Sequence, residues 1–437
     1  MHTKGSSAAG IAFQGSGSEA VIDGSLTISN VDGDKAEKQG RYIGVSGIRM
    51  TGDNTSMTVT GPVNISGFKG SALHTAGADS VISVGGGTIS TAADADKSHN
   101  FYAARVEKGT VNINMKNGAP GSARTNIIGD MYVTGQYGKK VIEYSGGQLA
   151  DWQHRGNLHV ALTDKDSSWT GVAAYEQYND NYGSGGNTMH DIGNFDLYLQ
   201  NGATWTNEQQ SHVTTTTLAG KNPVYNGSYL MKLHGGSDAV HKGYIYQKDS
   251  KPITVDNYSG HTLVFYDHTG DGSAAENYSA GDFRIKTAEE GSSITLRTGA
   301  GGINTADKTA AGKALNSLAN KLYYMSYAQG DTKLKGTVEI AEGLTSSSVS
   351  ASGDIAFRTD TAADKNGQGT YVYEPEEPLD GPIIKDRLLK GETTVTADDT
   401  HAEDGYVSAA YNGDDSITVD MANHGLRLEA ASSASAK

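Results

Sequence analysis

The chain has 437 residues and a formal charge of −15, with 57 glycines, only 7 prolines and no cysteine. Glycine has no strict period of three and proline is scarce, which excludes a collagen triple helix. The negative charge argues against nucleic acid or an anionic membrane as a partner, because both would be repelled. Without cysteine a disulfide scaffold is excluded, and the 23 tyrosines provide apolar surface for a folded core.

Short stretches of alternating apolar residues recur along the chain, and each ends at a glycine, asparagine or aspartate. They lie at 20–29, 56–66, 80–90, 109–118, 194–202, 292–299 and 336–343. Alternation places the apolar residues on one face of a strand and the polar residues on the other. The recurring strands predict an all-β fold, a right-handed single-stranded parallel β-helix (β-solenoid). Because the stretches recur at irregular intervals, we expect the loops between the strands to vary in length.

The clearest internal repeat compares residues 157–171 with residues 194–207. In each copy alternating apolar residues lead into a polar turn and then to a Trp-Thr pair, which begins at Trp169 in the first copy and at Trp205 in the second. A segment ending at Trp152 resembles a third, weaker copy. We expect the tryptophans to face inward and to stack in the core of the coil.

A segment without alternation, residues 173–193, separates the two Trp-Thr copies and predicts a long loop. Long loops on a regular scaffold tend to be either functional or disordered. Tyrosine rings can stack on a sugar, and neighbouring amides and carboxylates can supply hydrogen bonds. The candidate ligand-binding residues of this loop are therefore Tyr175, Tyr178, Asn179, Asp180, Asn181 and Tyr182.

Two segments interrupt the strand pattern in the second half of the chain. Residues 305–328 carry apolar residues at helical spacing and predict an amphipathic helix, with Asp307 or Thr305 as its N-cap. Residues 375–382 combine three prolines with acidic residues and predict a linker. The predicted organisation is β-helix coils at 1–300, a closing section with the helix at 301–374, the linker at 375–382, and a further β module at 383–437.

The string DLYLQNGATWT at 196–206 and the region from Gly281 to residue 374 resemble the passenger domains of bacterial autotransporters, in particular the adhesive, self-associating ones. This resemblance implies a cell-surface adhesin that acts in cell–cell aggregation, biofilm formation or attachment. Its partner would be a host or bacterial glycan or protein, or another copy of itself. It also implies that the chain is part of a longer exported protein, anchored in the outer membrane by a C-terminal barrel outside this sequence.

Two other functions remain open. A β-helix can serve as a polysaccharide lyase or hydrolase, for which the chain offers close aspartate pairs: Asp32 and Asp34, Asp94 and Asp96, Asp164 and Asp166, and Asp414 and Asp415. These pairs lie in turn-like strings and are interpreted as turn residues. A structural stalk is the other alternative. The 13 histidines have no zinc-ligand spacing, and we expect them on the surface. We predict no enzyme, catalytic residue, cofactor or metal.

Overall fold

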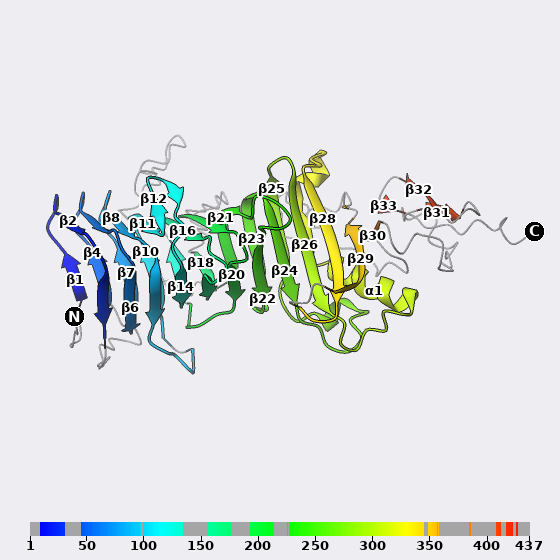
Figure 1. Ribbon diagram of the computed structural model, residues 1–437, viewed down its shortest axis with the longest axis horizontal. Helices are drawn as coiled ribbons and strands as arrows, with labels where there is room; N and C mark the ends of the chain where they lie inside the picture. Colours follow the sequence, from blue (N-terminus) through cyan, green and yellow to red (C-terminus); the bar gives the residue numbers. More distant parts are fainter. Residues whose placement is uncertain are drawn as a thin grey trace, which may run out of the picture. The chain divides into compact units, whose positions relative to one another are not determined.

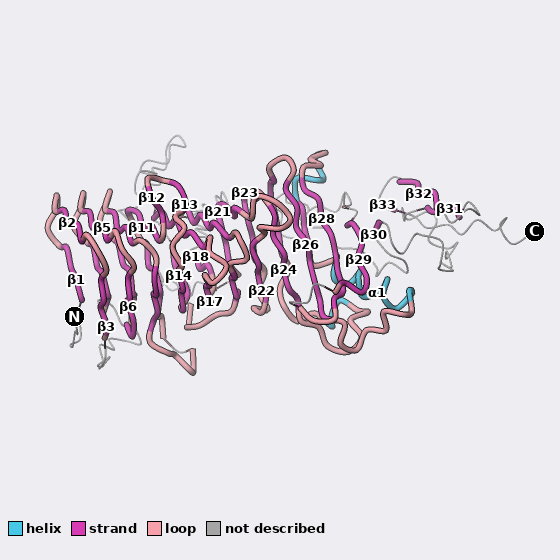
Figure 2. Tube along the Cα trace, viewed as in Figure 1, coloured by secondary structure: helices cyan, strands magenta, loops and turns pink. Residues whose placement is uncertain are grey.

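The computed structural model describes residues 9–30, 45–97, 99–133, 156–175, 193–213, 225, 227–344, 348–355 and 357, and the backbone of short strands at 384–385, 408–411, 417–422 and 425–426. The chain divides into two compact units, Met1–His234 (unit 1) and Gly235–Lys437 (unit 2). Figure 2 shows that strands joined by loops dominate both units. The predicted all-β class is therefore confirmed.

Unit 1 is a parallel β-helix in which successive coils contribute strands to three sheets (Figure 1). The first sheet contains, in spatial order, β1 (Ala9–Phe13), β4 (Ser46–Met50), β7 (Ser71–Thr75), β10 (Tyr102–Val106), β15 (Asp130–Val133) and β18 (Ala173–Tyr175). The second contains β2 (Glu19–Ile22), β5 (Ser56–Val59), β8 (Val81–Val84), β11 (Gly109–Ile113), β16 (Gly156–Leu162), β19 (Asn194–Leu199) and β21 (Ser228–His234). The third contains β3 (Leu26–Ser29), β6 (Val63–Phe68), β9 (Gly87–Thr91), β14 (Thr125–Ile128), β17 (Ser168–Thr170) and β20 (Thr204–Asn207).

The core of unit 1 is built from columns of apolar residues that share a register position. In the third sheet one column consists of Ile28, Ile65, Ile89, Ile127, Trp169 and Trp205, all fully buried. The rings of Trp169 and Trp205 stack with their centroids 4.8 Å apart, as expected from the repeat. Their Nε1 groups donate to the carbonyl oxygens of Gly129 and Gly171, at 3.0 and 2.9 Å. The indole N–H groups are thus satisfied inside the core.

Unit 2 continues with parallel strands in two sheets. One contains β22 (Gly243–Gln247), β24 (His261–Tyr266), β26 (Ser292–Gly299) and β28 (Leu334–Ala341); the other contains β23 (Ile253–Ser259), β25 (Phe283–Ala288) and β27 (Leu322–Tyr324). The parallel series ends at β28, because β29 (Val349–Ile355) pairs with it antiparallel and β30 (Ile384–Lys385) pairs antiparallel with β29. A separate antiparallel sheet contains β31 (Ser408–Tyr411), β32 (Ile417–Ala422) and β33 (Gly425–Leu426).

The inserted helix is present but shorter than predicted. Helix α1 spans Lys308–Ala319 and packs against β26 and β28. Asp307 is its N-cap, as predicted, and accepts hydrogen bonds from the backbone N–H groups of Thr309 and Ala310. The predicted end at residue 328 is wrong, since Leu322 begins β27 and a 3₁₀-helix follows at Met325–Gln329. The Leu-Tyr-Tyr segment pairs with β25, so the pairing of strands overrides the helical spacing of the apolar residues there.

All seven predicted stretches carry strands, so the fold is the predicted parallel β-helix. The first sheet was not predicted, nor was the small antiparallel hairpin of β12 (Met115–Lys116) and β13 (Ala119–Pro120). Strand β18 occupies the first three residues of the segment predicted as a loop from residue 173, so the prediction is wrong for these residues. The sequence does not predict this strand because Ala-Ala-Tyr shows no alternation of apolar and polar residues. Trp152 and the linker at 375–382 lie outside the described residues.

Candidate functional site

The ligand-binding residues predicted in the loop are not brought together by the described part of the chain. Tyr175 is the last residue of β18, where its backbone pairs with Val133 of β15. The other five, Tyr178, Asn179, Asp180, Asn181 and Tyr182, lie outside the described residues. Among the described residues, the candidate surface consists of outward-facing strand residues.

The outer face of the third sheet in unit 1 is an uncharged surface that extends over six consecutive strands. Its residues alternate with the buried column, so they point away from the core. They are Thr27, Ser29, Asn64, Ser66, Thr88, Ser90, Asn126, Ile128, Ser168, Thr170, Thr204 and Thr206, named here the neutral face. None of the six strands contains a charged residue. Every residue of the neutral face is partly or fully exposed, so its hydroxyl and amide groups can reach a partner.

The sequence does contain the signal for this face. The strings LTIS, VNIS and GTIS place a small polar residue on each side of the inward isoleucine. Alternation alone identifies these positions as the polar side of strands, and their shared lack of charge is the additional signal. In a chain with a net charge of −15, a neutral surface is where another acidic molecule can approach with the least repulsion.

The outer face of the second sheet differs, because it carries charged and aromatic side chains. His159 Nδ1 lies 3.4 Å from Asp196 Oδ2. The rings of Tyr198 and His234 stack with centroids 4.2 Å apart, and Lys232 is exposed beside them. This face offers polar groups of both signs, in contrast to the neutral face.

A buried carboxylate fixes a segment of chain to the first sheet. Asp130 of β15 is fully buried and accepts hydrogen bonds from the backbone N–H groups of Val172, Gln210 and Ser211 at 3.0, 3.0 and 2.8 Å, and from Ser211 Oγ at 2.8 Å. Residues 208–213, named here the strap, thereby lie on this sheet, where Val213 packs with Tyr102 and Tyr132. Burial raises the pKa of Asp130 to about 6, although the hydrogen bonds that it accepts act in the opposite direction.

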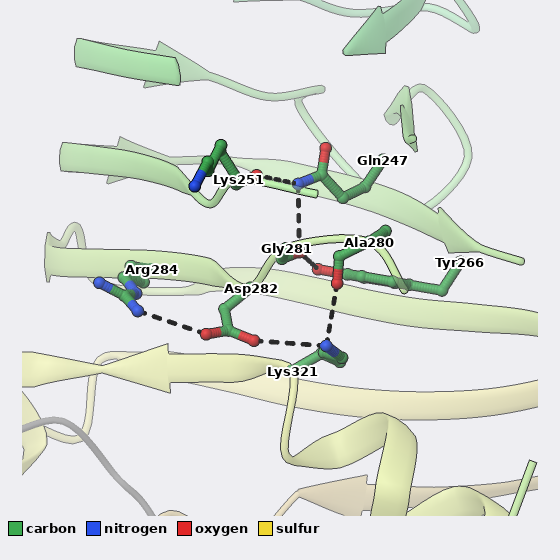
Figure 3. A network of polar contacts seen from close by, with 8 residues as sticks. All are labelled: Gln247, Lys251, Tyr266, Ala280, Gly281, Asp282, Arg284 and Lys321. Atoms are coloured by element: carbon green, nitrogen blue, oxygen red, sulfur yellow. Dashed lines mark hydrogen bonds and ion pairs between the residues drawn. The ribbon is translucent and has the colours of Figure 1, made fainter. Parts of the chain in front are cut away.

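In unit 2 a polar cluster joins three consecutive segments of the coil (Figure 3). The carbonyl oxygen of Gly281 accepts hydrogen bonds from Gln247 Nε2 at 3.1 Å and from Tyr266 Oη at 3.0 Å. Asp282 lies between Arg284 and Lys321, at 3.3 and 3.6 Å. The cluster holds a single carboxylate, already paired with two cations, so it lacks the second acid–base group that glycoside hydrolysis needs. Its contacts hold the turn before β25 in place.

We expect the loss of Gln247 to destabilise unit 2 more than the loss of the Tyr266 hydroxyl. Gln247 Nε2 donates both to Lys251 O and to Gly281 O, whereas Tyr266→Phe leaves Gly281 O with its second donor. Tyr266→Phe should cost about 0.5–1.5 kcal/mol, and Gln247→Leu about 1–3 kcal/mol, because Lys251 O loses its side-chain donor and Gly281 O keeps only that of Tyr266. Urea unfolding of the two variants measures the difference. Equal losses would contradict the role given to Gln247.

The predicted turn role is confirmed at Asp94 and Asp96, where the N–H of Lys97 donates to Asp94 O at 3.0 Å, and at Asp164 and Asp166. Asp164 Oδ1 accepts a hydrogen bond from the N–H of Asp166 at 2.9 Å, and the N–H of Ser167 donates to Asp164 O at 2.8 Å. Among the described residues no group of three or more histidine, aspartate or glutamate side chains could hold a metal ion. The expectation that the histidines lie on the surface is wrong for His74, which is buried beside Glu107.

No helix in the described part of the chain has the length and apolar character needed to span a membrane. The chain matches no protein-family model, no curated protein and no solved structure.

Proposed function

We propose that this chain is the adhesive part of a bacterial cell-surface protein, the passenger region of an autotransporter, and that it binds its partner through the neutral face. The observation that carries the proposal is the continuity of this face over six strands without a charged residue. The partner is a surface glycan or protein, or another copy of the chain. The resemblance of residues 196–206 and of the region after Gly281 to adhesive passengers supports the same function.

The neutral face is suited to adhesion by many weak contacts. A hydrogen bond made by one hydroxyl or amide contributes only about 0.5–1.5 kcal/mol. Neighbouring parallel strands are about 4.8 Å apart, so the same groups recur at a short, regular spacing along the face. Many such contacts along one molecule, and many molecules on one cell, combine into high avidity. Adhesion therefore requires no deep pocket.

The proposal is tested by placing charges on the neutral face. We expect Thr88→Glu combined with Thr204→Glu to reduce aggregation or attachment of beads coated with the chain by about tenfold or more, since a charge in a contact surface must lose its hydration. The matched control is Thr58→Glu combined with Thr110→Glu, which adds the same charge to the outer face of the second sheet.

The control should keep wild-type attachment, and both variants should keep the wild-type melting temperature within a few degrees. If the two variants lose attachment equally, the effect comes from net charge and the neutral face is not the contact surface. If neither loses attachment, adhesion uses another part of the chain. Attachment assays at several salt concentrations separate the two effects, since salt screens net charge.

A further inference from the structure

Three basic side chains occupy one register position on consecutive strands of the first sheet in unit 1. Arg49 of β4 pairs with His74 of β7, and His74 pairs with Arg105 of β10. These strands lie side by side in Figure 1. The flanking positions, Leu73 and Ala104 among them, are buried in the core, so the three basic side chains point outward. Arg49, His74 and Arg105 are named here the basic row.

The basic row contains more positive than negative charge. The only carboxylate that pairs with it in the described part of the chain is Glu107, 2.5 Å from Arg105 Nη2 and 3.5 Å from His74 Nε2. Burial by itself would raise the pKa of Glu107, but contact with His74 and the charge of Arg105 lower it to about 2. Burial lowers the pKa of His74, which is therefore neutral at pH 7. The row thus holds two guanidinium groups and one carboxylate, which pairs with Arg105 and not with Arg49.

Among the described residues, Arg49 is the guanidinium of the row without a hydrogen-bond or ion-pair partner. Its side chain makes no hydrogen bond or ion pair to another described residue, and its Nε is buried without an acceptor. A guanidinium has five N–H donors. Ala12, the register partner of Arg49 on β1, is small and exposed and carries no group that could bind the guanidinium. A bound anion would supply the acceptor that the buried Nε of Arg49 lacks.

We propose that the basic row is a binding site for the carboxylate of an acidic sugar, with Arg49 as its principal donor. An arginine fork matches the two oxygens of a carboxylate. At the other end of the row Arg105 lies over the ring of Tyr132, with Cζ 6.0 Å from the ring centroid. A long polyanion is disfavoured by the net charge of −15, whereas a single carboxylate interacts locally, within a Debye length of about 8 Å in physiological salt.

This site lies on a different sheet from the neutral face and does not depend on the proposed function. The test uses the full chain and two oligosaccharide probes. The trisaccharide sialyllactose carries one carboxylate, and the disaccharide lactose carries none. Isothermal titration calorimetry compares the wild type with Arg49→Gln and Arg49→Lys. The control variant is Arg124→Gln, which removes an exposed arginine elsewhere in unit 1.

We expect the wild type and Arg124→Gln to bind sialyllactose and not lactose, and Arg49→Gln to bind at least about tenfold more weakly. Arg49→Lys keeps the charge but not the fork and should lie between them. The site is refuted if the wild type does not bind sialyllactose, if lactose binds equally well, or if Arg49→Gln and Arg124→Gln bind alike. Circular dichroism confirms that the variants are folded. A variant that loses bead attachment but still binds sialyllactose would bear on the neutral face and leave the basic row supported.

Discussion

Replacing Trp205 with alanine should lower the free energy of unfolding of unit 1 by about 3–5 kcal/mol. Trp205 is fully buried and stacks on Trp169 with an angle of only 3° between the ring planes. The substitution leaves a cavity next to Trp169 and removes the donor to Gly171 O. Gly171 has a φ of +154° and its backbone lies close to Gly129, so this turn has little freedom to collapse into the cavity.

Urea unfolding followed by far-ultraviolet circular dichroism measures this effect, and two further variants provide the comparison. Trp205→Phe keeps an aromatic ring in the column but not the N–H donor, so it should cost less than alanine. Val21→Ala removes an apolar side chain that is 61% exposed and should change stability by less than about 0.5 kcal/mol. If Trp205→Ala unfolds at the same urea concentration as Val21→Ala, the stacked pair does not stabilise the coil.

Asp130 should make unit 1 less stable as the pH rises, whereas most carboxylates in folded proteins have the opposite effect. Its pKa is about 6 in the folded chain against an ordinary value of 3.8, so the folded state binds the proton more tightly than the unfolded state. The stabilisation linked to this proton is fully present below pH 3.8 and is lost as the pH rises to about 6. A pKa difference of this size corresponds to about 3 kcal/mol.

Asp130→Asn removes the titration and isolates this effect. The amide places an N–H₂ group among donors from Val172, Gln210 and Ser211, so the variant should also lose about 1–3 kcal/mol. We expect the stability difference between wild type and variant to change between pH 4 and pH 6 and to stay constant above about pH 7. Amide hydrogen exchange of the strap, residues 208–213, reports the local part of the change. A constant difference across the whole range would show that Asp130 does not titrate there.

The sequence predicts the second and third sheets well because their strands have one face toward the core and one face toward solvent. Leu197 and Leu199 alternate with partly exposed positions, and the same holds for Val111 and Ile113. Strand β7 is an exception, since all five of its residues, Ser71–Thr75, are buried and three of them are polar. Buried strands of this kind show no period of two. The first sheet was missed for this reason.

The candidate surfaces were harder to predict than the strands. Arg49, His74 and Arg105 lie in three different coils, and only the pairing register places them in one row. That register depends on the lengths of the turns between strands, which no local pattern specifies. The neutral face needed only the local strings around Ile28, Ile65 and Ile89, so it could have been predicted. The strap could not, because Ser211 reaches Asp130 across 81 positions of sequence.

The antiparallel pairing of β28 with β29 has a consequence for growth of the fold. A parallel coil that ended in an open edge would be a template for the first strand of another molecule, and repeated addition would give a fibre. Strand β29, which itself pairs antiparallel with β30, occupies the edge of β28 to which a further parallel coil would add. This reversal of strand direction protects unit 2 against end-to-end polymerisation through this sheet.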